Sequence, residues 1–421
     1  MPAKRVLLSM MVVAAMTGAA AAEPPGRLPT GPQVGDHDLS PFYRWSDALP
    51  DKPGAVLRQE PQPAQAEINA AGTATRLLYT STDARWRSGI VPVSGTLYLP
   101  TGTPPAGGWP LVAWAHGTLG VSDRCAPSWA GHKPRDAAYI NRWLQNGFAV
   151  VATDYQGLGG PGPHPYLIWE AEGRSVLDAA RAALVAGGGR IANKLFVTGQ
   201  SQGSGAAIGA TRLAESYAPD VKLKATLATG VVPSFPEGPY KPAPLAITTP
   251  VFTILMMVGG GLPDDGPTAD TLVGEPGKPV LAAARDGCTA EMAAAARAGQ
   301  VSVANAFSRP PEAIASSLTK VTDMSMVRLP VPVMLGTGLA DKLVVPTYQF
   351  GAVAALCAAG SPILWRTYPG VTHNGGVHAS FNDALAFFRA VDSGQPPPAN
   401  CASITPPGAP QDATAGLAYN D

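Results

Sequence analysis

Short apolar runs alternate with amphipathic helical patterns along most of this chain. Eight runs bounded by glycine, proline or polar residues predict strands, at residues 75–82, 95–100, 109–117, 148–155, 194–200, 224–230, 331–338 and 363–370. Helical patterns lie between several of them, at residues 135–147, 170–189, 203–217 and 381–394. Strands that alternate with helices of this length predict an α/β fold, with a mostly parallel sheet and helices on both faces.

The pattern changes along the chain and predicts five segments. Residues 1–22 have two early cations, an apolar centre and a small-residue end, which is typical of a secretory signal peptide cleaved after Ala22. The alternative is a buried N-terminal helix. Residues 23–70 are rich in proline, glycine and glutamine and predict an extended lead-in. Residues 71–230 and 326–421 carry the strand–helix pattern, and residues 231–325 interrupt it with apolar and alanine-rich helical stretches, which predicts an inserted cap.

Composition narrows the classes of function. Of 421 residues, 46% are hydrophobic and 14% charged, and 30 basic side chains balance 30 acidic ones. This balance gives no electrostatic reason to expect nucleic acid or acidic lipid as a partner. The apolar run 251–258 is too short to span a bilayer, so we expect no transmembrane segment after the signal peptide. The run is either ordinary core or the apolar side of the cap, facing a substrate pocket.

The predicted export of the chain makes its four cysteines informative. They are widely spaced and contain no CxxC pair, so we expect no structural metal. An even count in an exported chain favours two disulfides, with three pairings to choose from, whereas buried free thiols are the alternative. We favour Cys125–Cys288 and Cys357–Cys401, because the second pair would hold the C-terminal tail to a nearby helix.

The stretch Gly199-Gln200-Ser201-Gln202-Gly203 matches the pattern G-x-S-x-G. A predicted strand precedes it and a small-residue helix follows, which is the strand–turn–helix context in which such a serine is a nucleophile. The turn needs small residues on either side because strand and helix pass closely there. The alternative is a glycine-rich helix start with no chemistry. We predict that Ser201 is an exposed nucleophile above the sheet.

A serine nucleophile needs a histidine base that a carboxylate orients, and in this fold the chain order is serine, acid, histidine. Only His373 and His378 follow Ser201. His373 lies in a loop directly after the last predicted strand and is the preferred base. Asp341 lies in the loop after the preceding strand and is the predicted acid, although it is also placed to cap a helix or to pair with Lys342.

Acyl transfer also needs donors for the oxyanion. We predict the backbone amide of Gln202, which follows the nucleophile, and that of Thr118 or its neighbour Gly117, after an earlier strand. Asp154 and Tyr155 end another strand and either line the pocket or support the nucleophile turn.

The combined motifs resemble the secretory lipases, the α/β-hydrolases that include fungal lipase A-type enzymes and bacterial exported members. The resemblance rests on AWAHGTLGVSDRCAPS, VVATDYQGLGGPGPHPY, GQSQG, DKLVVP and PGVTH, in this order, within residues 75–395. It implies the α/β-hydrolase fold, a mainly helical cap between nucleophile and acid, and the triad Ser201, Asp341 and His373. Ser204 departs from the family pattern, which usually has a second glycine there.

The expected function is therefore that of an exported serine hydrolase of carboxylic esters, a lipase or esterase working through an acyl-enzyme, secreted or periplasmic. It would need no cofactor or metal. Its partner would be a small-molecule or lipid ester, with transient contact to a lipid interface through the cap. The alternatives are an amidase or peptidase with the same triad, and an inactive hydrolase fold that only binds.

Overall fold

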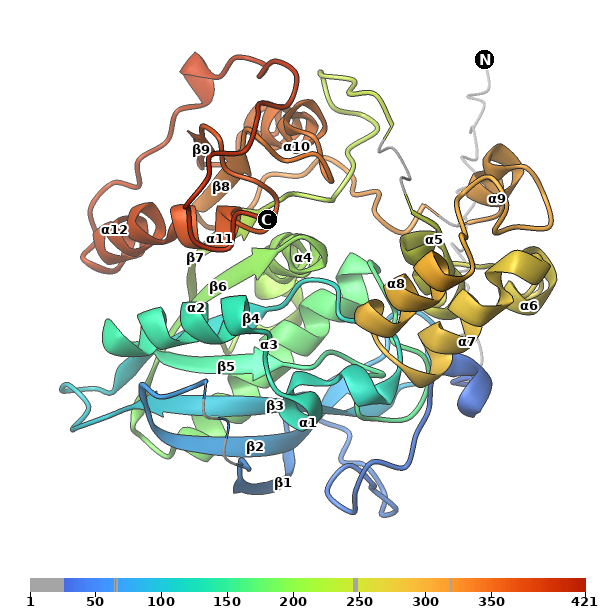
Figure 1. Cartoon of the computed structure of the whole chain (residues 1–421). Coiled ribbons are helices and arrows are strands. Elements are labelled where there is room, and N and C mark those ends of the chain that lie inside the picture. Colours follow the sequence, from blue (N-terminus) through green and yellow to red (C-terminus); the bar gives the residue numbers. More distant parts are fainter. Residues whose placement is uncertain (1–25, 64, 66, 245–248, 319) are drawn as a thin grey trace, which may run out of the picture.

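The computed structural model describes residues 26–421 except residues 64, 66, 245–248 and 319 (Figure 1). The predicted signal peptide, residues 1–22, lies outside the described residues.

A nine-stranded sheet forms the centre of the molecule, in the order β1-β2-β3-β5-β4-β6-β7-β8-β9 (Figure 1). Its strands are β1 (Val56–Pro61), β2 (Ala71–Thr82), β3 (Ile90–Pro100), β4 (Trp109–Ala115), β5 (Ala149–Thr153), β6 (Ile191–Gln200), β7 (Leu223–Thr229), β8 (Val333–Gly338) and β9 (Ile363–Tyr368). Neighbouring strands pair antiparallel from β1 to β5 in this order. From β5 onward, through β4 and β6 to β9, neighbouring strands pair parallel. All eight predicted strands are confirmed. Strand β1 was not predicted, and it lies in the stretch expected to be an extended lead-in.

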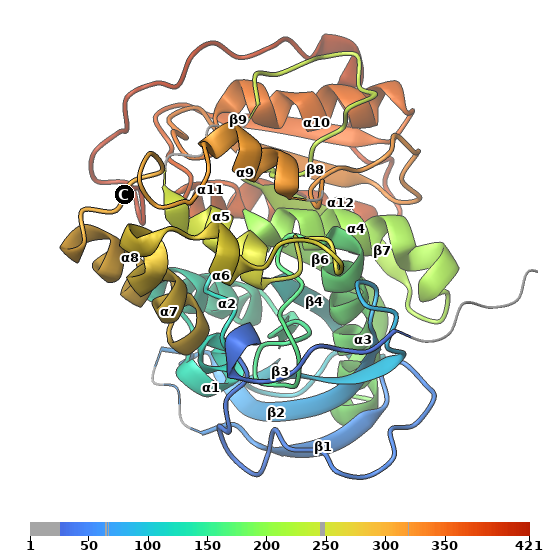
Figure 2. The same ribbon diagram turned by 90° about the vertical axis from the view of Figure 1, so that its right-hand side faces the viewer.

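Twelve α-helices accompany the sheet in the described part of the chain. They are α1 (Pro127–Ala130), α2 (Pro134–Gln145), α3 (Trp169–Gly187), α4 (Gln202–Tyr217), α5 (Pro250–Val258), α6 (Ala269–Leu272), α7 (Lys278–Asp286), α8 (Thr289–Ala298), α9 (Pro311–Ser317), α10 (Pro346–Ala358), α11 (Gly376–Ala379) and α12 (Phe381–Asp392). The four helical patterns at 135–147, 170–189, 203–217 and 381–394 correspond to α2, α3, α4 and α12. Figure 2 shows α3 and α4 crossing the sheet on one face.

Both faces of the sheet are covered because successive side chains of a strand point to opposite sides. In β6, Leu195 and Val197 pack with α3 and α4, whereas Phe196 between them packs with α2 and α12. The rings of Trp143 and Phe388 stack with their centroids 5.3 Å apart over the second face. The fold is thus the predicted α/β-hydrolase fold, a mostly parallel sheet with helices on both faces.

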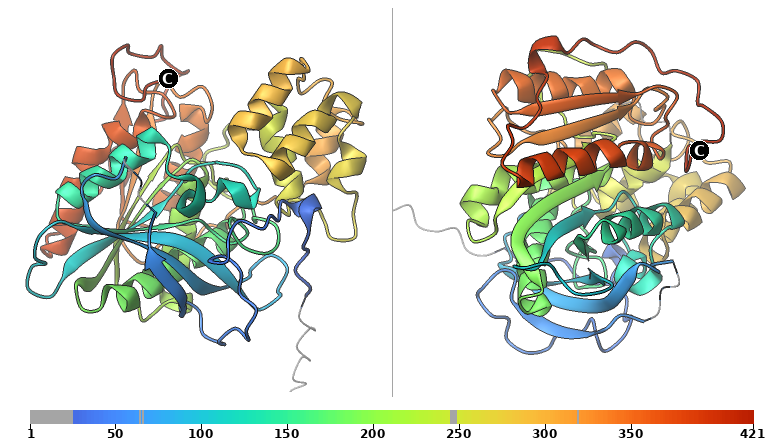
Figure 3. Two further views of the ribbon diagram at one scale, coloured as in Figure 1. Left: turned by 60° about the horizontal axis from the view of Figure 1, so that its bottom comes forward. Right: turned by 90° about the vertical axis from the view of Figure 1, so that its left-hand side faces the viewer.

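Helices α5–α9 have an apolar core of their own and lie to one side of the sheet (Figures 1 and 3). Leu255 of α5, Leu281 of α7 and Met292 of α8 are buried together there. The apolar run 251–258 is thus helix α5, which contributes both to this core and to a cavity described below. No helix of the described residues is long and apolar enough to cross a membrane.

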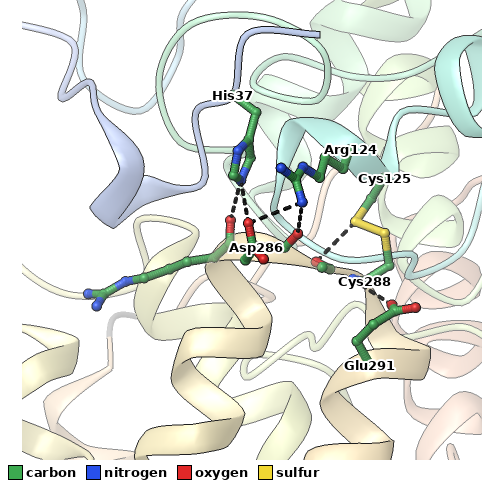
Figure 4. The surroundings of a disulfide bond; sticks show 8 residues. His37, Arg124, Cys125, Asp286, Cys288 and Glu291 are labelled. Carbon is green, nitrogen blue, oxygen red and sulfur yellow. Dashed lines mark hydrogen bonds and ion pairs between the residues drawn. A yellow bond between two sulfur atoms is a disulfide. The ribbon is translucent and has the colours of Figure 1, made fainter.

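Two disulfides join segments that are distant in sequence. Cys125 pairs with Cys288 and Cys357 with Cys401, with Cα–Cα distances of 5.6 and 5.5 Å. The favoured pairing is confirmed. The first bond fastens the loop after β4 to the start of α8, and the ion pair Arg124–Asp286 lies beside it, with a nitrogen–oxygen distance of 3.2 Å (Figure 4). The second bond fastens the tail that follows α12 to α10, as expected.

Candidate active site

Ser201 lies at the turn between β6 and α4 with φ 57° and ψ −121°. A positive φ is unusual for a residue with a side chain and costs free energy, so the surrounding structure must hold it in place. The amide of Ser201 donates to Thr229 O at 3.0 Å, and its carbonyl accepts from Ser204 N at 2.8 Å. The serine is partly exposed, whereas residues 202–211, which follow it in α4, are buried.

The close approach of β6, β4 and α4 explains the glycines beside Ser201. A Cβ on Gly199 would overlap the carbonyl of Gly203, and one on Gly203 would overlap the carbonyl of Ala115 in β4. Both are backbone atoms that cannot move aside without opening the sheet or the helix. The sequence expectation of small residues at these positions therefore has a direct steric reason.

Asp341 and His373 are brought together by the loops that leave β8 and β9. His373 Nδ1 lies 2.7 Å from Asp341 Oδ2. The same oxygen accepts from Gln349 Nε2 at 2.9 Å, and Asp341 Oδ1 accepts from the amides of Leu343 and Val344 at 2.9 and 2.8 Å. Both oxygens of the buried carboxyl group accept hydrogen bonds, so its position is fixed and it can orient the imidazole through Nδ1.

Ser201 and His373 border the same cavity, which has a volume of about 620 Å³. His373 Nε2 is buried and has no hydrogen-bond partner among the described residues, so its lone pair is not engaged elsewhere. The side chain of Gln200 donates to His373 O at 3.2 Å and thereby links the histidine loop to the strand that carries the serine. The arrangement provides a hydroxyl and an oriented imidazole facing one space.

The two predicted oxyanion residues lie on the borders of the same site. Gln202 begins α4, where the first amides of a helix have no partner within the helix. Thr118 follows β4 and borders the large cavity, and its hydroxyl lies 2.8 Å from the Tyr166 hydroxyl. A second cavity, of about 200 Å³, is bordered by Ser201, Gln202 and Thr118 together. The segments that carry the two predicted donors thus border the space beside Ser201.

Other candidates are placed away from this cavity. His378, the alternative base, lies 2.9 Å through Nε2 from Arg135 O and has no contact with Asp341. Asp154 is buried and accepts from Ser94 Oγ at 2.6 Å and from Ser128 N at 2.9 Å. Tyr155 is buried as well and donates to His116 O at 3.0 Å. Neither Asp154 nor Tyr155 borders the two cavities at Ser201, so they support the loops around the site.

A buried polar group behind the nucleophile turn was not predicted. The side-chain amide of Gln202 donates to Glu172 Oε1 and to His164 Nε2, both at 2.7 Å. His164 Nδ1 in turn lies 2.9 Å from Gln156 O. Burial lowers the pKa of His164 to about 3 and raises the pKa of Glu172 to about 8. The helical pattern at 170–189 places Glu172 in a helix, but only the tertiary fold shows that it faces the interior.

The raised pKa of Glu172 predicts a pH-dependent stability. Between about pH 4.5, the ordinary value, and pH 8 the folded protein keeps this proton and the unfolded chain releases it. The unfolded state then binds fewer protons, so the free energy of unfolding falls as pH rises through this window. Glu172→Gln should remove this dependence on pH. The free energy of unfolding of the variant, relative to that of the unmodified protein, should therefore rise by a few kcal/mol between the two pH values.

Urea unfolding at several pH values measures this difference. Glu170→Gln is the matched control, because Glu170 lies on the same helix and its partly exposed carboxylate pairs with Arg174 at 2.6 Å. If the difference in the free energy of unfolding between Glu172→Gln and the unmodified protein does not change with pH, Glu172 is ionised in the folded protein and the prediction is wrong.

One segment of the chain matches a family model of known proteins. Residues 133–237, from the segment before α2 to the loop after β7 and including Ser201, match the model of the secretory lipase family. A sequence comparison with curated proteins gives no match.

Solved structures of lipases and esterases share the fold. Lipase A of Candida antarctica is similar with a TM-score of 0.63 and 20% identity, over 87% of this chain and 86% of that one. The closed state of the same lipase is similar with a TM-score of 0.61 and 19% identity, over 90% of both chains. The rice cell wall degrading esterase LipA of Xanthomonas oryzae is similar with a TM-score of 0.60 and 17% identity, over 81% of this chain and 98% of that one. These similarities show that the chain shares the fold of these lipases and esterases.

Within the described residues, no cluster of three or more His, Cys, Asp and Glu side chains is arranged to hold a metal ion. The polar groups at the cavity instead fit general acid–base and nucleophilic chemistry.

Proposed function

We propose that this protein is an exported serine hydrolase that cleaves carboxylic esters with Ser201, His373 and Asp341. The observation that carries the proposal is the 2.7 Å contact of His373 Nδ1 with Asp341, at a cavity that Ser201 also borders from a strained turn. His373 Nε2 would take the proton of the Ser201 hydroxyl as the oxygen attacks the ester carbonyl. The amides of Gln202 and Thr118 would stabilise the oxyanion.

The reaction would proceed in two balanced steps. In the first, the carbon–oxygen bond to the leaving alcohol breaks and His373 returns the proton to that alcohol, which leaves an ester on Ser201. In the second, His373 takes a proton from water, the resulting hydroxide attacks the acyl carbon, and the proton returns to Ser201 as the acid departs. Asp341 would keep Nδ1 protonated and stabilise the imidazolium in both steps.

The two cavities at Ser201 differ in character, which suggests how an ester would lie. The cavity of about 200 Å³ is bordered mainly by apolar side chains, among them Leu167, Val232, Phe252 and Met256. It suits the acyl chain. The cavity of about 620 Å³ is more polar, with Lys133 and Arg135 on its border, and suits the leaving alcohol. Phe252 and Met256 belong to α5, so we propose that α5–α9 form a cap over the acyl side and contact lipid interfaces transiently.

A series of p-nitrophenyl esters from acetate to palmitate, with and without emulsified triglyceride, tests this function. We expect hydrolysis that favours short to medium chains, since the apolar cavity is small, and covalent labelling of Ser201 by a fluorophosphonate. Hydrolysis confined to peptide amides would instead support an amidase or peptidase. Absence of both hydrolysis and an adduct on Ser201 would leave only a binding role for the fold.

A further inference from the structure

Residues 411–421, here called the tail segment, run along the loops that carry the proposed acid and base. The segment follows the disulfide Cys357–Cys401 and ends beside α11 (Figure 1). It contains no helix or strand, and its sequence, QDATAGLAYND, has no apolar periodicity. Its contacts are therefore tertiary ones, and most of them fall on two loops of the site.

The tail segment fastens the loop that precedes Asp341. The amide of Gln411 donates to Leu339 O at 2.7 Å, two residues before the acid. The side chain of the same residue accepts from Gly370 N at 3.0 Å, in the loop that carries the base. One residue of the tail segment thus bridges the two loops that must hold Asp341 and His373 together.

Asn420 fastens the histidine loop more closely. Its Oδ1 accepts from Thr372 N, the residue before His373, at 2.7 Å. Its Nδ2 donates to Gly370 O at 2.9 Å and to Thr414 O at 2.8 Å. A Cβ on Gly375, on the other side of His373, would also overlap Asn420. The amide group is therefore enclosed by the residues that fix the backbone of His373.

The neighbours of Asn420 reach the cavity itself. Tyr419 and Asp421 border the cavity of about 620 Å³ together with Ser201 and His373. The ring of Tyr419 packs on His378 with the centroids 4.6 Å apart. Tyr419 has φ 56°, a strained conformation for a bulky residue, which these contacts must hold in place. Strain of this kind is often found at functional sites.

We infer that the tail segment is part of the active site, with Asn420 as a positioning residue for His373 and Tyr419 and Asp421 as a wall of the leaving-group side. This inference rests on the proposed ester hydrolysis. Asn420 would act through the Thr372 amide, so that His373 Nε2 stays aimed at Ser201. Tyr419 and Asp421 would limit the size and shape of the alcohol that fits beside the acyl-enzyme.

Asn400, which lies before the tail segment, provides the control for Asn420. Its side chain makes two backbone hydrogen bonds of the same kind, accepting from Trp365 N at 2.8 Å and donating to Trp365 O at 2.9 Å. Those bonds fasten Trp365 of β9, which borders neither cavity at Ser201. Both variants therefore remove hydrogen bonds between a side-chain amide and the backbone, three for Asn420→Ala and two for Asn400→Ala, and only Asn420→Ala removes them from the histidine loop.

The experiment measures kcat, KM and thermal stability for both variants with one p-nitrophenyl ester. We expect Asn420→Ala to lower kcat about 10- to 100-fold with little change in KM, because misplacing a catalytic group by about 1 Å has an effect of this size. Asn400→Ala should keep kcat within about 2-fold, since its bonds lie outside the site. Equal kcat in the two variants would overturn the role of Asn420.

Tyr419→Ala tests the wall independently, at a partly exposed position where substitution should not prevent folding. Esters with one acyl group and alcohols of increasing size should then show a changed preference among alcohols, with the preference among acyl chains unchanged. An unchanged alcohol preference would overturn the wall. An unmodified protein without hydrolysis on any ester would instead overturn the proposed function, which distinguishes the two failures.

Discussion

Ser201→Ala is expected to lower kcat for every ester by about 10⁴-fold or more, because no acyl-enzyme can form without the hydroxyl. The backbone of α4 and the amides at its start would remain, so substrate binding and KM should change little. Residual activity would come from the oxyanion donors and from positioning of water by His373. Steady-state kinetics on a p-nitrophenyl ester and mass spectrometry after fluorophosphonate treatment measure the two effects.

Ser216→Ala is the matched control, since Ser216 lies near the other end of α4 and its exposed hydroxyl only donates to Leu213 O. Activity and labelling should match those of the unmodified protein. Persistence of the fluorophosphonate adduct in Ser201→Ala would mean that another serine is the nucleophile.

Asp341→Asn is expected to lower kcat by about 10³- to 10⁴-fold. Asp341 accepts four hydrogen bonds from donors on all sides, among them His373 Nδ1 and Gln349 Nε2 on one oxygen. An asparagine amide would direct an N–H group at one of these donors, so the imidazole would turn or adopt the other tautomer. Nε2 would then carry a proton and could not accept one from Ser201.

Asp383→Asn tests the same argument by comparison. Asp383 follows His373 in the chain and accepts from the Tyr368 hydroxyl at 2.8 Å, a bond that an asparagine oxygen can keep. Its kcat should stay close to that of the unmodified protein in the same ester assay. If Asp383→Asn, and not Asp341→Asn, lost activity, the choice of acid by chain order would be wrong.

The sheet and the nucleophile turn could be predicted because local sequence determines them. Each strand from β2 to β9 is an apolar run with a clear end, and Gly199 and Gly203 follow from the steric limits of the turn. Asp341 and His373 followed from chain order and from their positions after two successive strands. The 2.7 Å contact between them agrees with that placement, although their roles stay predictions until activity is measured.

What the sequence could not show depends on contacts between distant segments. β1 carries Arg58 and Glu60 at the edge of the sheet and has none of the apolar alternation of the other strands. In the sequence alone, Glu172 is one of several charged residues of a helix, and Gln349 is a polar residue of another helix. Asn420 lies in a tail without periodicity. Each acquires its role only when the fold brings a second segment against it.

The position of Tyr419 and Asp421 at the cavity has a practical consequence for producing the protein. Residues appended after Asp421, such as an affinity tag, would begin at the rim of the site and add foreign side chains where the alcohol is proposed to lie. A purification handle that a protease removes before the assay keeps measurements of substrate preference free of this interference.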